Sequence, residues 1–345
     1  MAFRSEILAW YKENKRDLPW RTNKNPYRVW LSEVILQQTR VEQGMPYFLN
    51  FVERYPSLEN LAKASEDEVL KLWQGLGYYS RARNMLFTAK YVQSELGGVF
   101  PKTAKELLQL KGVGTYTASA IASICFNEPV AVVDGNVYRV LARYFGETLP
   151  INSTEGIKVF KELANTVMDK EQPGDYNQAI MEFGSLQCSP VNPNCDSCPL
   201  SNSCSALATS RIDQLPLKLK KTKVQTKYYN YMVILDSNEG VLIEQRTGKG
   251  IWKGLYEFPL LETDQKATVD QIKSYLASLP YVKEYEMSLY NETPISHKLS
   301  HRKLLTHFWI VELNYKNEKA VPKSQLTNFA VPVLIANFLK AFKIY

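Results

Sequence analysis

Residues 110–118 read Leu110-Lys111-Gly112-Val113-Gly114-Thr115-Tyr116-Thr117-Ala118 and join two segments with helical hydrophobic spacing. The glycines on both sides of Val113 permit a tight turn and let the backbone come close to a ligand. The amides that begin the second segment then face outward at the positive end of a helix dipole, which favours a phosphate oxygen. The stretch predicts a helical hairpin that binds DNA through Lys111, Gly112 and Gly114. A plain turn between two helices has the same pattern.

The first 207 residues have the hydrophobic spacing of helices throughout. Apolar side chains recur at intervals of three and four residues at Trp30, Leu31, Val34 and Ile35, at Val69, Leu70 and Trp73, at Leu107, Leu108 and Leu110, and at Val137, Val140, Leu141 and Tyr144. We therefore predict an all-α domain over residues 1–207.

The pattern changes after this region. Residues 215–227 carry five lysines and no acid, and they have no period that would bury one face. We predict a basic linker over residues 208–227, which either stays solvated or follows a DNA backbone. Short β-rich runs then predict a smaller α+β domain over residues 228–345, with strands at Tyr229–Leu235, Gly240–Ile243 and Leu304–Leu313 and helices at Val269–Leu279 and Val331–Phe342.

The composition is that of a globular protein with a basic surface. The 345 residues are 45% hydrophobic and carry a net charge of +7, which suits a polyanionic partner. No apolar run reaches the roughly 18 residues of a membrane span, and the N-terminus does not have the pattern of a signal peptide. We expect an intracellular, cytoplasmic monomer without membrane contact, associated with the nucleoid if the source is bacterial.

Four of the five cysteines lie in one short loop, at positions Cys188, Cys195, Cys198 and Cys204. The loop also contains three prolines and is too small to bury a core, so a bound metal has to supply its stability. Zinc sites more often pair two close cysteine couples, whereas here one couple is flanked by single cysteines. The spacing favours one 4Fe-4S cluster, with tetrahedral zinc as the alternative.

All three histidines lie in the predicted second domain, so acid–base chemistry in the helical domain falls to carboxylates, tyrosine or lysine. Glu33 has Val29, Trp30, Leu36 and Gln37 as its helical neighbours. A carboxyl on such an apolar face has a raised pKa and is a candidate general acid. A glutamate at the edge of that face, pointing into solvent, is the alternative interpretation.

Asp134 follows an apolar run and precedes Gly135 and Asn136 at the start of a predicted helix. Its simplest role is an N-cap, and a capping carboxylate is also ionised and held in place. A protonated carboxyl and a nearby carboxylate are the pair that cleavage of a glycosidic bond requires. On DNA the same chemistry would release a base that has been flipped from the stack.

With these motifs assembled, the chain resembles the adenine DNA glycosylases of the MutY type, within the helix-hairpin-helix glycosylase superfamily. The likeness extends over nearly the whole chain and is dense in Leu18–Arg21, Pro26–Tyr27, Trp30–Val34, Leu36–Thr39, Gly75–Arg83, the Gly112 hairpin, Asp134–Val137 and the cysteine loop. It implies an all-α helix-hairpin-helix glycosylase domain with an iron-sulfur cluster loop, followed by an α+β Nudix-like domain.

The resemblance also implies roles for residues of the first domain. Glu33 would protonate the adenine ring and later take the proton of a water, while Asp134, held by Asn136, would stabilise the sugar cation. Further matched positions would contact DNA: Gln38, Leu76 and Tyr78 would probe the opposite base and fill the opened stack, and Arg21 would lie near the flipped-base pocket, with a surface ion pair as its alternative.

Tyr116 bears on whether the DNA strand is also cut. Relatives that nick the strand have a lysine at this hairpin position, because an amine forms a Schiff base with the sugar. Tyr116 therefore predicts a monofunctional enzyme with weak or no strand cleavage.

The second domain resembles the Nudix-like domain with which such enzymes recognise 8-oxoguanine. The glutamate-rich metal box of Nudix hydrolases is missing between Pro259 and Leu279, so we expect no pyrophosphate hydrolysis. Ser300 and His301 match the loop that reads the oxidised base, and Leu299 stands where the family commonly has phenylalanine. The expected partner is duplex DNA with adenine opposite 8-oxoguanine or guanine.

Two other functions compete with this one. A glycosylase for another lesion, such as an oxidised pyrimidine, would leave the second domain unexplained and would lack the hairpin lysine. A lesion-binding protein without catalysis would have no use for both Glu33 and Asp134.

Overall fold

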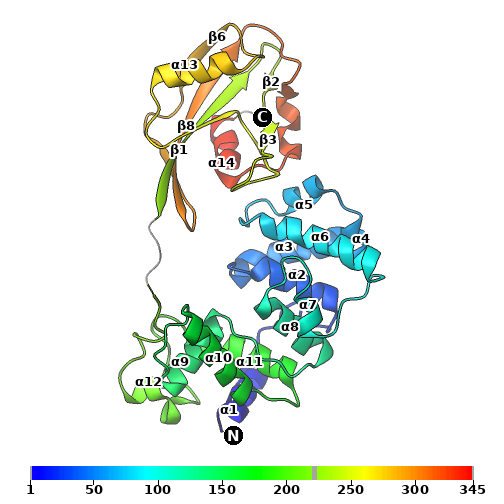
Figure 1. The fold of residues 1–345 in the computed structure, drawn as a ribbon, viewed down its shortest axis with the longest axis vertical. Helices are drawn as coiled ribbons and strands as arrows, with labels where there is room; N and C mark the ends of the chain where they lie inside the picture. Colours follow the sequence, from blue (N-terminus) through cyan, green and yellow to red (C-terminus); the bar gives the residue numbers. More distant parts are fainter. Residues whose placement is uncertain (1, 220–223, 344–345) are drawn as a thin grey trace. The chain divides into compact units, whose positions relative to one another are not determined.

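The computed structural model of the chain describes residues 2–219 and 224–343 (Figure 1). The chain forms two compact units: Met1–Lys63 with Asn84–Lys220, and Ala64–Arg83 with Lys221–Tyr345. The boundaries predicted at residues 207/208 and 227/228 stay a prediction. Residues 220–223 of the predicted linker lie outside the described residues. The grouping of residues 64–83 with the C-terminal part rests on contacts between distant segments, which no local pattern reveals.

The first unit is built from helices, as the sequence predicts. They are α1 (Ala2–Asn14), α2 (Pro26–Leu36), α3 (Val41–Arg54), α4 (Leu58–Ala62), the part of α6 (Ser80–Glu95) from residue 84, α7 (Ala104–Leu107), α8 (Thr115–Phe126), α9 (Gly135–Phe145), α10 (Thr154–Val167), α11 (Pro173–Leu186), η1 (Ser201–Ser203) and α12 (Ser205–Ala208).

Helix α11 lies at the centre of this unit. It packs against α1, α8 and α9, and α8 packs in turn against α2. Glycine permits one of these close approaches, because a Cβ on Gly184 would lie 2.7 Å from the Asn136 Cβ and 2.9 Å from the Asn136 carbonyl oxygen. Helix α8 therefore contacts both α2 and α11, and α11 carries α9 on another side.

The described start of the predicted linker is packed against the first unit. Leu215 is buried, the amide of Ile151 donates to the Leu217 carbonyl at 3.0 Å, and Asn152 bonds the backbone of Leu219. A freely solvated tether therefore does not describe residues 215–219.

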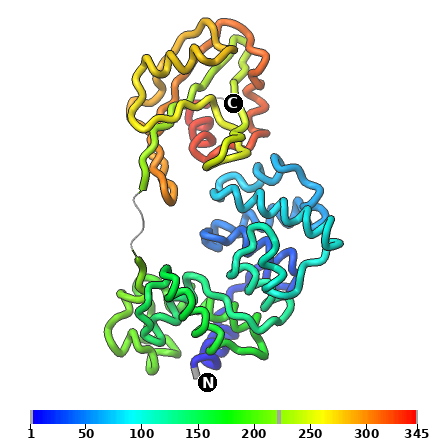
Figure 2. The backbone as a smooth tube through the Cα atoms, in the orientation of Figure 1, coloured from blue at the N-terminus to red at the C-terminus, as the bar shows by residue number. Residues whose placement is uncertain are grey.

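The second unit combines a mixed sheet with helices on both faces. Its strands are β1 (Gln225–Leu235), β2 (Gly240–Val241), β5 (Leu260–Thr263), β6 (Tyr285–Leu289), β7 (Ile295–Lys298), β8 (Arg302–Leu313) and β9 (Val321–Pro322), with β3 (Glu244–Gln245) and β4 (Tyr256–Glu257) in a separate pair. The order is β6-β8-β1-β2-β9, and β5 and β7 pair with β1 and β8. The long strands β1 and β8 are parallel and run side by side (Figure 2).

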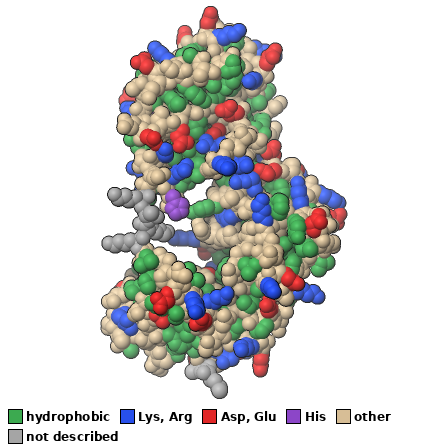
Figure 3. All heavy atoms as spheres, in the orientation of Figure 1, with side chains coloured by type: hydrophobic (Ala, Val, Ile, Leu, Met, Phe, Trp, Pro, Cys, Tyr) green, Lys and Arg blue, Asp and Glu red, His purple; other side chains and the backbone are tan. Residues whose placement is uncertain are grey.

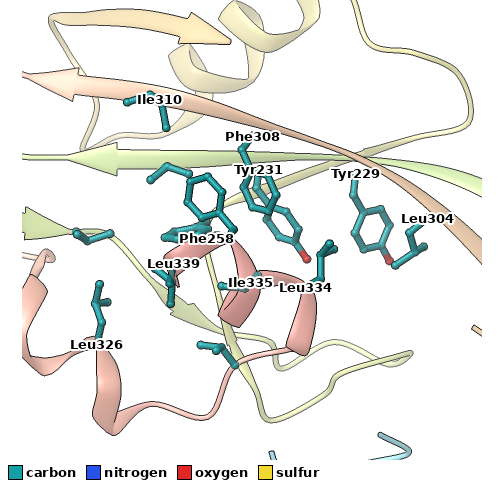
Figure 4. Close-up of a cluster of buried hydrophobic side chains, with 14 residues drawn as sticks. Tyr229, Tyr231, Phe258, Leu304, Phe308, Ile310, Leu326, Leu334, Ile335 and Leu339 are labelled. Atoms are coloured by element: carbon teal, nitrogen blue, oxygen red, sulfur yellow. The ribbon is translucent and has the colours of Figure 1, made fainter. Parts of the chain in front are cut away.

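Alternation along β1 divides the core of this unit into two layers. Tyr229 and Tyr231 face one way, toward α14 (Val333–Phe342), and Figure 4 shows them with Phe308 and Phe258 on that side. Met232 and Ile234 face the opposite way, toward α13 (Val269–Ser278). The 3-10 helix η2 (Lys323–Asn328) and α5 (Glu66–Leu72) complete the unit. The predicted strands and helices of this domain are thus found, although the run Gly240–Ile243 is a strand only over its first two residues.

Lys and Arg side chains are spread over both units on the face in view, interspersed with Asp and Glu (Figure 3). Within the described ranges, no helix is both long enough and apolar enough to cross a membrane.

Candidate functional site

Helix α2 presents Glu33. Asn25 caps the helix by accepting from the Arg28 amide at 3.2 Å, and Pro26 occupies its first turn, where its missing N–H costs nothing. Burial of the surrounding face raises the pKa of the Glu33 carboxyl from 4.5 to about 7. A hydrogen bond with Tyr116 opposes that rise, and the negative charge of Asp134 adds to it.

Helix α8 brings Tyr116 to the same place. Gln37 of α2 donates to the Thr117 hydroxyl at 3.3 Å and so ties the two helices together. The Tyr116 hydroxyl lies 3.3 Å from the Met181 sulfur on α11. Burial, followed by the charges of Glu33 and Asp134, raises the pKa of Tyr116 well above 10, so the phenol is neutral.

Asp134 caps α9. One oxygen accepts from the amides of Asn136 at 2.9 Å and Val137 at 2.8 Å, and the other accepts from the Asn136 side-chain amide at 2.8 Å. Burial raises the pKa of Asp134 above 3.8, while these hydrogen bonds oppose the rise. Three donors and a helix N-terminus therefore stabilise its charged form, whereas Glu33 receives one bond from a phenol.

Glu33, Tyr116 and Asp134 each keep part of their surface exposed, so a ligand can reach them. The structure thus brings together three of the four predicted catalytic residues through their charges and hydrogen bonds, and the fourth, Asn136, holds Asp134. A carboxyl with a pKa near neutrality can donate a proton. A hydrogen-bonded carboxylate beside it can stabilise a cation in the same step.

Asn136 is itself held by Arg139. The guanidinium donates to the Asn136 side-chain oxygen at 2.9 Å, to the Gly184 carbonyl at 2.6 Å and to the Cys188 carbonyl at 2.8 Å. A continuous set of hydrogen bonds therefore joins Asp134 to the start of the cysteine loop.

Arg21 pairs with a buried glutamate that the sequence analysis did not single out. Glu182 is 1% exposed and accepts from Arg21 at 2.8 Å and from Arg16 at 2.8 and 2.9 Å. Burial opposes the charge of Glu182, but the hydrogen bonds from Arg16 and Arg21 outweigh it and lower the pKa to about 2. Its signal was present in the sequence, since Glu182 stands among Ala179, Ile180, Met181 and Phe183, as Glu33 stands among apolar neighbours.

A pocket of about 460 Å³ opens beside this ion pair. Arg21, Trp20 and Tyr11 line it, and the cationic side chains on its wall are Lys12, Lys15, Arg16, Arg21 and Lys24. The charge of Arg21 also lowers the pKa of Glu33, but the residues that line the pocket include neither Glu33 nor Asp134.

The hairpin packs on helix α6. Gly112 has φ +81, and a Cβ there would lie 2.7 Å from the Asn84 Cβ, so a side chain would be strained as well as crowded. Gly114 caps α8 without a side chain, which leaves first-turn amides for a ligand. The Lys111 ammonium lies 4.3 Å from the centre of the Phe87 ring, and the side chain is exposed. This geometry suits a phosphate contact.

The four loop cysteines are free thiols, each partly exposed. Burial is the largest cause that raises the pKa of Cys198 to about 11, and the charges of Cys188, Cys195 and Cys204 contribute to that rise. Among the described residues, no three His, Cys, Asp or Glu side chains converge on one ion position.

Arg143 organises the loop from within. It is 2% exposed, lies 3.5 Å from the Cys188 sulfur, and donates to the carbonyls of Ser189 and Pro190. The loop thus supplies four thiols and a cationic N–H donor beside one of them, and thiolate ligands with such a donor are the chemistry of an iron-sulfur site.

The remaining predicted DNA contacts lie in two places. Gln38 is exposed at the end of α2, with φ +57. In the second unit Leu76 is buried, Tyr78 is half exposed, and the Tyr78 hydroxyl contacts the Ser300 hydroxyl. His301 follows on the exposed turn, and the Leu299 amide donates to the Arg302 carbonyl at 2.8 Å, which closes that turn.

Comparisons with known proteins agree with this architecture. The model of the HhH-GPD superfamily of base excision DNA repair proteins matches residues 31–162, and that of the NUDIX domain matches residues 230–341. These matches confirm the predicted combination of a helix-hairpin-helix domain and a Nudix-like domain.

Individual relatives are similar over most of the chain. An adenine DNA glycosylase from Buchnera aphidicola (Schizaphis graminum) is 35% identical, covering 92% of this chain and 90% of its own. The adenine DNA glycosylase of Mus musculus is 34% identical, and the match covers 93% of this chain and 72% of its own. A thermostable thymine-DNA glycosylase structure is 32% identical with a TM-score of 0.56, covering 60% of this chain and 95% of its own. A structure of an endonuclease III–DNA complex shares the fold. It is 22% identical with a TM-score of 0.52, and the match covers 60% of this chain and 94% of its own.

Proposed function

Because this chain belongs to the adenine DNA glycosylase family of DNA repair hydrolases, we propose that its substrate is adenine paired with 8-oxoguanine or guanine in duplex DNA. The observation that carries the proposal is the pair of unlike carboxyls, Glu33 with a pKa of about 7 and Asp134 held by three donors. In this proposal Ser300 contacts the base opposite the adenine, and through this contact the second unit contributes to the choice of substrate.

In the proposed reaction Glu33 donates its proton to a ring nitrogen of the flipped adenine. The bond between the sugar carbon and the base then breaks, and the bonding electrons leave with the neutral base. The Asp134 carboxylate stabilises the positive charge on the sugar. A water then adds to that carbon, and its proton returns to the Glu33 carboxylate, so Glu33 ends the cycle protonated.

Tyr116 limits the reaction to base release. Its phenol is neutral and cannot form the Schiff base through which a lysine would open the sugar and cut the strand. Its interaction with the Glu33 carboxyl lowers the pKa of that carboxyl. We expect no efficient covalent trapping of DNA by borohydride.

DNA would be held by the surfaces described above. Lys111, Gly112 and Gly114 would bind a backbone phosphate, and Arg21 and Gln38 would stand at the flipped base and its partner. Leu76 and Tyr78 would fill the space that the flipped base leaves, while Ser300 and His301 would read the opposite 8-oxoguanine.

One 4Fe-4S cluster would be held by Cys188, Cys195, Cys198 and Cys204. When bound, it would supply structural cross-linking of the loop, with Arg143 hydrogen-bonded to a ligand sulfur. The loop residues themselves would shape a surface near Arg139, which holds Asn136.

The test is single-turnover release of adenine from duplexes with adenine opposite 8-oxoguanine, guanine or thymine. We expect abasic sites on the first two substrates and far fewer on the third. Glu33→Gln should bind the first duplex and release no adenine, while Glu53→Gln, an exposed glutamate, should match the unmodified protein. Absence of product opposite 8-oxoguanine would refute the proposal.

A further inference from the structure

Residues 64–83 form a short helix and a strained loop. Helix α5 begins with a capping box in which Ser65 and Glu68 bond each other's backbone amides. The loop after it has positive φ at Gly75, Gly77 and Tyr78. The loop is closed from within, because the Trp73 indole donates to the Gly77 carbonyl at 3.0 Å. It is therefore a preformed shape that carries Leu76 and Tyr78.

Lys71 and Gln74 join this segment to the C-terminal domain, which we define as residues 224–343. The Lys71 ammonium donates to the Phe329 carbonyl at 3.0 Å and to the Gln74 side-chain oxygen at 3.3 Å. That oxygen also accepts from the Val331 amide at 3.4 Å. We call this set of four residues the latch. Burial lowers the pKa of Lys71, in keeping with its position between the two segments.

A second group of contacts fastens the other side of the segment. The Gln245 amide donates to Asp67 at 3.2 Å, and the Arg83 guanidinium contacts the Lys253 carbonyl. Gly254, with φ +84, permits the close approach, because a Cβ there would lie 3.0 Å from a Glu66 oxygen. The segment is therefore held before and after its loop.

The loop cannot shift without breaking these contacts. Gln74 directly precedes Gly75, and Lys71 lies one helical turn before it, so a displacement of the loop by even one residue's length would break the bonds to Phe329 and Val331. Hydrogen bonds from a charged donor contribute more than neutral ones, so Lys71 is the stronger half of the latch.

We propose that Lys71 and Gln74 are positioning residues that fasten the Gly75–Tyr79 loop to the Phe329–Val331 segment. The C-terminal domain then sets where Leu76 and Tyr78 stand when the duplex is opened, in addition to reading the opposite base. This inference rests on the proposed function, in which an adenine must leave the stack before its bond is cleaved.

The experiment separates opening of the duplex from bond cleavage. Lys71→Met keeps an unbranched side chain of similar length and removes the donor, and Lys71→Arg restores a donor. On adenine opposite 8-oxoguanine we expect Lys71→Met to slow single-turnover release by about tenfold, the usual cost of one charged hydrogen bond. On adenine opposite an abasic-site analogue, where no base pair has to open, we expect a change of less than about twofold.

The matched control is Lys319→Met, which removes an exposed lysine that lies over the Tyr281 ring in the same domain. This variant should release adenine at the same rate as the unmodified protein from both duplexes. Hydrogen exchange gives a readout without catalysis: amides 73–81 should exchange faster in Lys71→Met, while those of β1 and α14 should not change.

Each outcome has a defined meaning. The positioning role of the latch would be overturned if Lys71→Met slowed adenine release equally on both duplexes. It would also be overturned if neither the rates nor the hydrogen exchange of residues 73–81 changed. Recovery by Lys71→Arg supports it. An unmodified protein that releases no adenine would refute the proposed function instead, and the exchange measurement would still test the latch.

Discussion

Glu33 and Asp134 differ in what surrounds each carboxyl. Glu33 lies on an apolar helix face and receives one hydrogen bond from Tyr116, so its proton is retained to about pH 7. Asp134 receives three hydrogen bonds at the start of a helix. In the proposed reaction, the same functional group would therefore supply an acid at one position and an anion at the other.

The acid role of Glu33 predicts a pH dependence. In the proposed reaction protonated Glu33 is the active form, so adenine release should be fastest below pH 7 and fall by about tenfold per pH unit above it. Single-turnover rates between pH 5.5 and 9 measure this limb. A profile that stays flat to pH 9 would contradict the assignment.

Glu182 predicts a dependence of stability on pH. Its pKa of about 2 in the folded chain lies below the ordinary 4.5, so its contribution is fully present above pH 4.5 and is lost as the pH falls toward 2. The contribution is about 3 kcal/mol for a shift of that size in a buried side chain. The difference in unfolding free energy between the unmodified protein and Glu182→Gln should therefore be large at pH 7 and smaller at pH 3. Glu171→Gln, an exposed residue, is the control. A difference that is independent of pH would count against the ion pair.

At the scale of elements, the site depends on how closely α9 and α11 approach. Gly184 on α11 faces the backbone of Asn136, the residue that bonds Asp134. The helix cannot carry a side chain there without moving the N-terminus of α9.

Gly184→Ala should therefore destabilise the first unit by about 1–3 kcal/mol, the usual cost of overpacking. Gly135→Ala is the matched control for stability, since a Cβ at Gly135 meets nothing within 4 Å. Denaturant unfolding compares the two. If both variants had the same unfolding free energy, α9 and α11 could move apart without loss of stability.

The cysteine loop makes a prediction of its own. Removing one of the proposed cluster ligands, as in Cys198→Ser, should lower bound iron below four per chain and destabilise the loop, because the loop has no core of its own. Iron, sulfide and zinc analysis of the purified protein measures this. One zinc and no iron in the unmodified protein would overturn the cluster.

At the scale of the whole molecule, the carboxylates belong to one unit and Ser300 to the other. Rate and substrate preference should therefore be separable. Ser300→Ala should reduce the preference for adenine opposite 8-oxoguanine over guanine by about tenfold, the loss of one specific hydrogen bond, and leave release opposite guanine nearly unchanged. Ser237→Ala, at a turn in the same unit, is the control. An equal loss on both mispairs would contradict the reading role.

Local patterns were sufficient for the helices, the long strands, the cysteine loop and the candidacy of Glu33 and Asp134, because periodicity, capping and ligand spacing depend on neighbours within a few residues. Two features became apparent only in the tertiary structure. The ion pairs of Glu182 with Arg16 and Arg21 join residues more than 160 positions apart, and the latch joins Lys71 to Phe329, 258 positions away. Contacts between residues so far apart depend on how helices and strands pack together, and this packing produces no repeating pattern in the sequence.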